Sequence, residues 1–329
     1  MEERSLFDID PSSSELGSCA GLWALMQVPG IGSAKALQIA RVSSSWSQLA
    51  EDPKLVLDQV GGGRVDPNNL VEMALNPLDP PKTSKDIRLI GYFDSDYPEA
   101  LREIGSAPAV LWVKGSVPEG LLAAVVGTRH PTEEGIKRVE KIVSVLVAKG
   151  YGIISGLAAG VDTVAHESAL KNGGKTWAYL GSGVDVPTPK ENLGLAEQIV
   201  EHGGGLLAEV DPSSEVSRHS LVARDRLQSG TSRFTVIGQS GIPSGTLHTA
   251  RFTLEQERHL IVVSPPDTER GTDAWAGNEA LIDENGCDPE ILKASKKLGE
   301  VISRKKPVAD VVINHSEDLE TFLEEHFND

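Results

Sequence analysis

Short apolar segments alternate with amphipathic segments between residues 123 and 264, and this alternation restricts the fold more than any other feature. The amphipathic segments repeat their apolar residues at helical spacing. A chain that alternates strands and helices in this way forms a parallel sheet with helices on both faces. The predicted fold is α/β, a doubly wound, mostly parallel, Rossmann-like sheet. We expect strands at 123–127, 152–155, 176–181, 205–209, 234–238 and 259–264, and helices at 132–149, 161–172, 190–202 and 244–257.

The N-terminal part of the chain follows a different pattern. Apolar residues from Leu22 to Ile39 have mostly helical spacing, broken by a glycine turn at 28–36 that resembles a helix-hairpin-helix motif. Such a turn exposes backbone N–H groups that can bind a phosphate, although it also serves as a packing element. A proline-rich run at 76–82 predicts a linker. We expect a small all-α, SAM-like helix-hairpin-helix domain at 1–81, a Rossmann-like domain at 82–295 and a C-terminal segment with an acidic tail at 296–329.

The charge balance is acidic, with 31 basic and 48 acidic residues and a net charge of −17. Such a chain repels polyanions in general, so a nucleic-acid site must be a local basic patch. Residues 309–329 contain seven acidic residues and no Lys or Arg, which is typical of a solvated helix face or a mobile arm.

Cys19 and Cys287 show neither CxxC spacing nor neighbouring histidines, so no metal site or disulfide is expected.

The sequence shows neither a membrane-spanning nor a secretory pattern. No run approaches the roughly 20 apolar residues that span a bilayer, and the first residues lack the order of a secretory signal. We therefore expect a cytoplasmic protein without membrane contact.

Polar and glycine-rich turns follow the expected strands. The carboxyl ends of parallel strands meet at one edge of a sheet, where ligands bind. Glycines allow close backbone approach there, hydroxyls donate hydrogen bonds, and an arginine can hold a phosphate with two hydrogen bonds. Neither a GxGxxG nor a GxxxxGK[ST] pattern occurs, which argues against NAD-dependent hydride transfer and ordinary ATP hydrolysis. The candidate phosphate-binding residues are Gly127, Thr128, Arg129, Ser155, Gly156, Gly181, Gly183, Ser244, Gly245, Thr246 and Thr249, and the pocket or structural candidates are Asp162, His166 and Asp185.

The order and spacing of several motifs resemble the DNA-processing protein A (DprA/Smf) family. The motifs are Val-Gly-Thr-Arg at 126–129, Ser-Gly-Leu-Ala-Ala-Gly-Val-Asp at 155–162 with Ala-His at 165–166, Leu-Gly-Ser-Gly-Val-Asp at 180–185, Pro-Lys-Glu-Asn at 189–192, and Ser-Gly-Thr-Leu-His-Thr-Ala-Arg at 244–251 with Glu-Gln at 255–256. The lead-in Asp-Tyr-Pro at 96–98 and the segment 108–115 are also similar to the family. The resemblance runs from about residue 97 to about residue 292.

The resemblance implies a protein that binds single-stranded DNA over the Rossmann sheet and forms a homodimer. It further implies help in loading a RecA-type recombinase during transformation or recombination, without a cofactor or chemical turnover. Carried over by position, Arg129, Arg224 and Arg226 are the expected DNA-phosphate contacts.

The chain departs from the family pattern in two places. Ala223 stands where the family has arginine and Asp225 where it has asparagine, which should weaken binding and flatten its salt dependence. About 37 residues follow Leu292, so the winged-helix domain of many members is not expected.

Two other interpretations of the function remain open. A nucleotide sensor or nucleotide hydrolase would use Ser244, Gly245, Thr246 and Glu255 on its phosphate and ribose side. His166 and His248 could suggest acid–base chemistry, but His166 lies four residues after Asp162, a spacing typical of a structural hydrogen bond. An acidic scaffold that binds only proteins would leave the phosphate-suited turns unexplained.

Overall fold

The computed structural model describes residues 13–327. Its contacts divide the chain into one compact unit up to Val113 and a second from Lys114 onward. The expected boundary near Pro81 falls in the extended segment between α5 and β1, inside the first unit. None of the helices in the described range has the length and apolar character needed to cross a bilayer.

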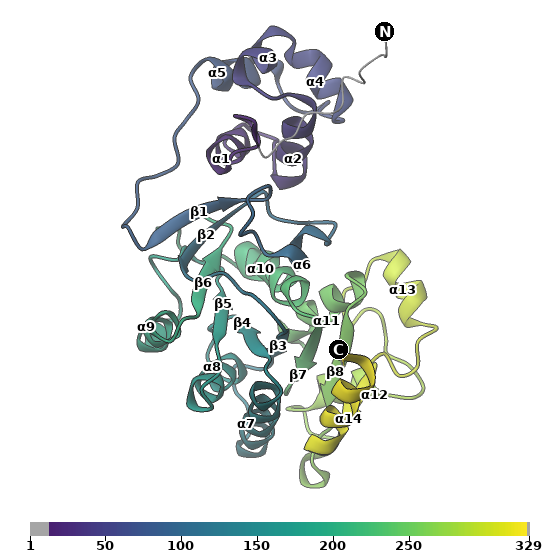
Figure 1. Ribbon diagram of the computed structural model, residues 1–329. Helices are drawn as coiled ribbons and strands as arrows, with labels where there is room; N and C mark the ends of the chain where they lie inside the picture. Colours follow the sequence, from purple (N-terminus) through teal and green to yellow (C-terminus); the bar gives the residue numbers. More distant parts are fainter. Residues whose placement is uncertain (1–12, 328–329) are drawn as a thin grey trace. The chain divides into compact units, whose positions relative to one another are not determined.

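Five short helices come first in the described part of the first unit (Figure 1). Ser18 and Ser45 cap α1 and α3, and Asp52 and Asp66 cap α4 and α5, each of which starts at a proline. The turn between α1 and α2 contains Gly30 at a φ of 87°, a left-handed conformation that favours glycine. Two short helices therefore flank the glycine turn, and its identity as a helix-hairpin-helix motif stays a prediction. The elements are α1 Cys19–Met26, α2 Ser33–Val42, α3 Trp46–Glu51, α4 Pro53–Gln59, α5 Pro67–Leu75, β1 Ile87–Gly91, α6 Glu99–Arg102 and β2 Val110–Gly115.

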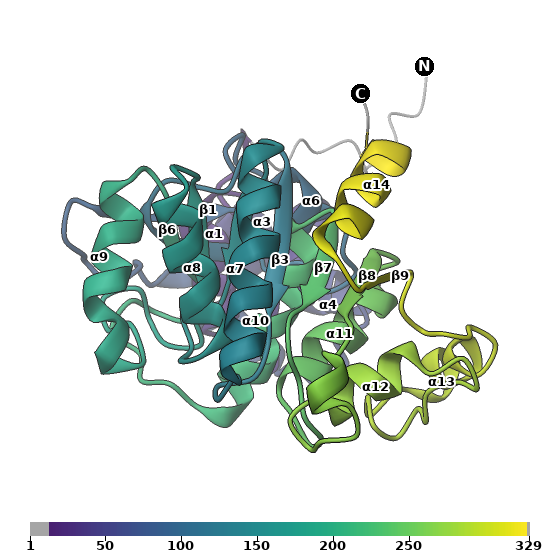
Figure 2. The same ribbon diagram turned by 90° about the horizontal axis from the view of Figure 1, so that it is seen from below.

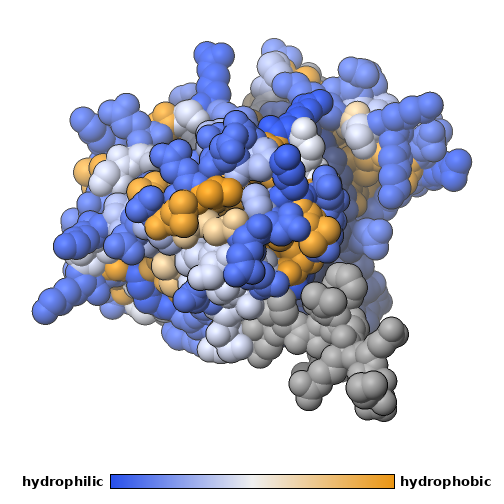
Figure 3. Space-filling view, turned by 90° about the horizontal axis from the view of Figure 1, so that it is seen from above, coloured by the Kyte–Doolittle hydropathy of each residue, from blue (hydrophilic) through white to orange (hydrophobic). Residues whose placement is uncertain are grey.

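Exposed apolar side chains of the first unit include Leu55, Leu75 and Leu78, which are 53%, 67% and 52% exposed. Figure 3 shows a surface that is mostly hydrophilic, with a group of hydrophobic side chains gathered on it.

Seven parallel strands form the sheet of the second unit, in the order β6-β5-β4-β3-β7-β8-β9. The chain moves outward from β3 to β6, returns to pair β7 with β3, and then moves outward on the other side. The junction of β3 and β7 is therefore the point where the strand order reverses. The strands are β3 Leu122–Val126, β4 Gly152–Ser155, β5 Thr176–Tyr179, β6 Gly205–Ala208, β7 Phe234–Ile237, β8 His259–Val263 and β9 Val311–Ile313.

Helices cover both faces of this sheet (Figures 1 and 2). Successive strand residues point to opposite faces: Val125 packs in a core with α7, α8 and α14, whereas Val126 packs in a second core with α11, α12 and α13. This confirms the predicted α/β, doubly wound fold. The helices are α7 Glu133–Ala148, α8 Val161–Lys171, η2 Lys190–Asn192, α9 Leu193–Glu201, α10 Arg218–Thr231, α11 Thr246–Glu255, η3 Asp267–Glu269, α12 Ala276–Ile282, α13 Lys296–Ile302 and α14 Ser316–Phe327.

The described part of the acidic tail is folded onto the second unit. Strand β9 pairs with β8, and α14 buries Leu319, Phe322 and Leu323 against the sheet. Its acidic residues include Glu324, which forms an exposed ion pair with Lys149 on α7. The tail is thus an amphipathic helix with a solvated acidic face.

Candidate functional site

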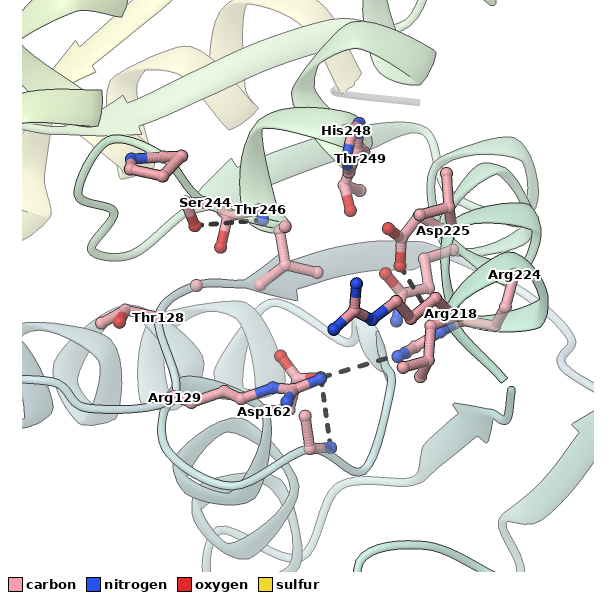
Figure 4. A pocket seen from close by; sticks show the side chains of 18 residues that line it. Thr128, Arg129, Asp162, Arg218, Arg224, Asp225, Ser244, Thr246, His248 and Thr249 are labelled. Atoms are coloured by element: carbon pink, nitrogen blue, oxygen red, sulfur yellow. Dashed lines mark hydrogen bonds and ion pairs between the residues drawn. The ribbon is translucent and has the colours of Figure 1, made fainter. Parts of the chain in front are cut away.

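A cavity of about 490 Å³ lies where the strand order reverses. Its walls come from the end of β3, the loop between β4 and α8, helix α10, and the loop that leads from β7 into α11 (Figure 4). Such a volume lies within the range of small-molecule sites, about 300–1,000 Å³. The lining residues are Val126, Gly127, Thr128, Arg129, Ala158, Asp162, Arg218, Leu221, Val222, Arg224, Asp225, Gln228, Pro243, Ser244, Gly245, Thr246, His248 and Thr249.

The deepest charged group of the cavity is Arg224, whose side chain is only 7% exposed. Its Nη1 lies 4.0 Å from Oδ2 of Asp162, and its Nε lies 3.4 Å from Oδ1 of Asp225. The side-chain oxygen of Gln228 accepts hydrogen bonds from this guanidinium and, at 3.0 Å, from the N–H of Gly156. A side chain at Gly156 would occupy the position of the Arg224 guanidinium, which explains the glycine.

The loop between β4 and α8 is held tightly around this arginine. Gly160 has a φ of 82°, and the first N–H of α8, from Val161, donates to the carbonyl of Thr128 at 3.1 Å. Asn192 reaches from η2 and donates to the carbonyl of Leu157 and the hydroxyl of Thr163, both at 2.8 Å. The predicted Pro-Lys-Glu-Asn motif therefore shapes the loop below the cavity.

Two more arginines stand at the mouth of the cavity. Arg129 leaves the loop after β3 and Arg218 opens α10, and both are exposed. Opposite them lies the start of α11, where the N–H of Thr246 donates to the Ser244 hydroxyl at 3.2 Å and Gly245 provides no side-chain cap. Cations on one side and a helix N-terminus on the other make this mouth suited to anions.

Two carboxylates, Asp162 and Asp225, place negative charge in the same cavity. Burial raises the pKa of Asp225 to about 7, partly countered by Arg224, and burial likewise raises the pKa of Asp162. Asp162 also accepts a hydrogen bond from the Ala158 N–H at 3.3 Å. The charge of the cavity therefore rises by one unit when Asp225 takes up a proton near neutral pH.

Comparison with known proteins identifies the family. The family model described as DNA recombination-mediator protein A matches residues 88–298, well over half of the chain. The chain belongs to this family. The resemblance found in the motifs is thereby confirmed.

Curated relatives of this chain carry the family's names. Protein Smf of Synechocystis is 37% identical over 231 residues, which are 63% of this chain and 58% of that protein. DNA processing protein DprA of Streptococcus pneumoniae is 37% identical over 174 residues, 52% of this chain and 60% of that protein. The chain thus spans about three-fifths of the length of these relatives.

Solved DprA structures share the fold. The crystal structure of DprA from Streptococcus pneumoniae has a TM-score of 0.66 at 23% identity, covering 92% of this chain and 97% of that one. DprA from Helicobacter pylori, solved to explain its single-stranded DNA binding mode, has a TM-score of 0.57 at 23% identity, covering 74% of this chain and 99% of that one.

Arg226, the third arginine expected to contact DNA phosphates, lies apart from Arg129 and Arg224. It does not line the cavity, because its Nη1 and Nη2 each lie 2.6 Å from a carboxylate oxygen of Glu209. Being two residues from Arg224 on one helix, it points to a different side. The structure thus places Arg226 outside the cavity that Arg129 and Arg224 line, and its contact with a DNA phosphate stays a prediction.

Several other predicted residues lie behind the cavity wall. The Ser155 hydroxyl donates to the Val125 carbonyl at 2.7 Å, and Gly181 packs against Leu221. The N–H groups of Gly183 and Asp185 donate to the carbonyls of Ser214 and Pro212 at 2.9 and 3.0 Å, which fixes the loop after β5. These residues hold neighbouring loops in place.

His166 is buried and pairs differently from the sequence-based expectation. Its Nδ1 lies 2.7 Å from the Thr176 hydroxyl, which itself donates to the Ile153 carbonyl, so the ring donates to Thr176. Burial lowers the pKa of His166 to about 3, and the ring is neutral at physiological pH. The expected hydrogen bond with Asp162 is therefore replaced by one with Thr176.

Sequence reasoning missed Arg218 and Gln228 as cavity residues. Both lie on one face of α10 together with Leu221, Val222 and Asp225. The helical spacing of these five positions was the available signal.

Among residues 13–327, no group of His, Cys, Asp and Glu has an arrangement that could hold a metal ion.

Proposed function

We propose that this chain binds single-stranded DNA at the carboxyl edge of its Rossmann-like sheet, with backbone phosphates held at Arg129 and Arg218, and that it performs no chemical turnover. The observation that carries this proposal is the gathering of three arginines in one cavity of a chain with a net charge of −17. The single-stranded DNA binding described for DprA from Helicobacter pylori, which shares the fold, supports it. Homodimerisation, a RecA-type partner and a cytoplasmic location are further proposals that rest on the family resemblance.

The two exposed arginines suit phosphate better than the buried one. A guanidinium at the cavity mouth can bind a phosphate with two charge-assisted hydrogen bonds while the rest of the strand stays in solvent. Arg224 is already engaged by Asp162, Asp225 and Gln228. We assign it to organising the cavity floor.

Binding of oligothymidine is expected to tighten as the pH falls from about 8 to about 6, because protonation of Asp225 removes a negative charge beside the phosphates. The charged groups facing Asp225 are Arg218 and Arg224 on α10, Asp162 on α8, Arg129 after β3, and Arg251 on α11. His248 lines the same cavity, and burial together with Arg251 and Lys293 lowers its pKa, which disfavours its charged form.

Titrations of labelled oligothymidine at both pH values measure this effect, and Asp225→Asn should bind equally well at both. A wild-type affinity that is independent of pH contradicts the prediction.

The raised pKa of Asp225 also makes the stability of the folded chain depend on pH. The stability that the neutral Asp225 carboxyl contributes is lost as the pH rises through about 7. Thermal unfolding of wild type and Asp225→Asn should therefore diverge on the alkaline side.

A small nucleotide is the second candidate ligand, favoured by the cavity volume of about 490 Å³. Fluorescence anisotropy with unlabelled competitors separates the two candidates. A strand should displace labelled oligothymidine far better than thymidine monophosphate does, because each added phosphate contact releases counterions. Equal competition by the mononucleotide would replace the DNA proposal with a nucleotide-binding one.

A further inference from the structure

A carboxylate is an unexpected group in a cavity that is to receive a polyanion. Asp225 lies on the cavity face of α10 among the arginines (Figure 4), and its side chain is 14% exposed. One of its oxygens, Oδ1, faces Arg224 Nε at 3.4 Å. Within the described part of the chain, no backbone or side-chain donor forms a hydrogen bond with this carboxylate.

The second carboxylate of the cavity differs in this respect. Asp162 is 8% exposed on its side chain, accepts from the Ala158 N–H and lies beside Arg224. It is thus part of the cavity floor. Asp225 is the carboxylate whose acceptor capacity is left for a ligand.

A phosphate cannot use this acceptor, but the edge of a base can. Guanine presents two adjacent donors, N1–H and N2–H₂, in a spacing that matches the two oxygens of a carboxylate, whereas thymine presents one N–H between two carbonyl oxygens. An ionised carboxylate therefore attracts the guanine edge and repels the carbonyls of thymine. Arg224 lies against Oδ1 and favours the ionised form.

Resting on the proposed function, we propose that Asp225 determines base specificity, accepting hydrogen bonds from a guanine of the bound strand while Arg129 and Arg218 hold its phosphates. The cavity volume of about 490 Å³ leaves room for a base behind the cationic mouth. Phosphate contacts position a strand without reading it, and a carboxylate on a base edge adds the sequence information.

The test compares three labelled strands of equal length at about pH 8, where Asp225 is ionised. One is oligothymidine, and in the other two every third thymidine is replaced by deoxyguanosine or by deoxycytidine, a spacing that avoids guanine runs. The guanine strand should bind about tenfold more tightly than oligothymidine, within the range of one good bidentate base contact. In Asp225→Asn the preference should disappear, while oligothymidine binds more tightly than to wild type.

Asp267→Asn is the matched control, because it removes a carboxylate that is 94% exposed and outside the cavity. It should change neither the affinity nor the preference, and circular dichroism verifies that both variants fold. Equal, salt-sensitive binding of all three strands overturns the base-specificity proposal and leaves the proposed function standing. A guanine preference that survives in Asp225→Asn also overturns it. Failure of every strand to bind overturns the proposed function itself.

Discussion

Arg224→Ala should destabilise the folded chain by about 3–5 kcal/mol, because it leaves two carboxylates in the cavity floor without their cation. Asp162 and Asp225 are 8% and 14% exposed on their side chains, and both face this guanidinium. Without it, both carboxyl groups should take up protons more readily, since burial already raises the pKa of each. The loss of stability should consequently be larger at about pH 8 than at about pH 6.

Chemical denaturation at the two pH values measures this difference. Arg304→Ala is a suitable control, since it removes an exposed arginine outside the cavity. The double variant Arg224→Ala, Asp225→Asn should be more stable than Arg224→Ala alone at the higher pH, because one of the two carboxylates left without a cation is then absent. A stability of Arg224→Ala equal to wild type at both pH values would contradict the assigned role of Arg224 in the cavity floor.

Gly156→Ala should be the second most damaging change, for a steric reason. The added methyl group would fall where the Arg224 guanidinium lies and also close to the Gln228 amide. Overpacking of this kind costs about 1–3 kcal/mol, and displacement of the arginine from Asp162 adds to that cost. We expect lower stability together with weaker oligothymidine binding, because Gly156 lies against Arg224 and Gln228, which line the cavity.

Gly245→Ala provides the matched comparison. This glycine also lines the cavity, but a methyl group there meets open space and its φ of −62° suits any residue. Thermal unfolding and anisotropy should separate the two variants, with Gly245→Ala close to wild type in stability. Equal stability of the two variants would show that the floor tolerates a displaced Arg224.

The alternation of strands and helices could be predicted because it depends on local sequence patterns. The predicted strand at 123–127 and the observed β3, Leu122–Val126, differ by one residue at each end. Four of the other five predicted strands agree as closely, and the strand predicted at 176–181 ends two residues earlier, at Tyr179. Helix α10 was not among the predicted helices. Its buried residues include Arg224, Gln228 and Thr231, so it lacks the apolar stripe by which an amphipathic helix is normally detected.

The site was predictable only as far as local sequence decides it. Glycine turns after strands placed Gly127, Arg129 and Gly156 at the correct edge of the sheet, because the carboxyl ends of parallel strands converge. The pairing of Arg226 with Glu209 on the loop after β6 joins residues 17 positions apart and depends on how α10 packs. Such pairing follows from tertiary structure, and no spacing rule along the chain reveals it.

The salt dependence of oligothymidine binding tests the central claim, that Arg129 and Arg218 hold DNA phosphates, most directly. Wild type is compared with the double variant Arg129→Ala, Arg218→Ala and with a charge-matched double variant, Arg270→Ala, Arg304→Ala, outside the cavity. Losing two phosphate contacts should lower the slope of log K against log salt by about 1.4 units, at roughly 0.7 per phosphate of a single strand, and weaken binding at least about tenfold at low salt. The charge-matched variant should keep the wild-type slope. Equal slopes for all three proteins would contradict DNA binding in this cavity.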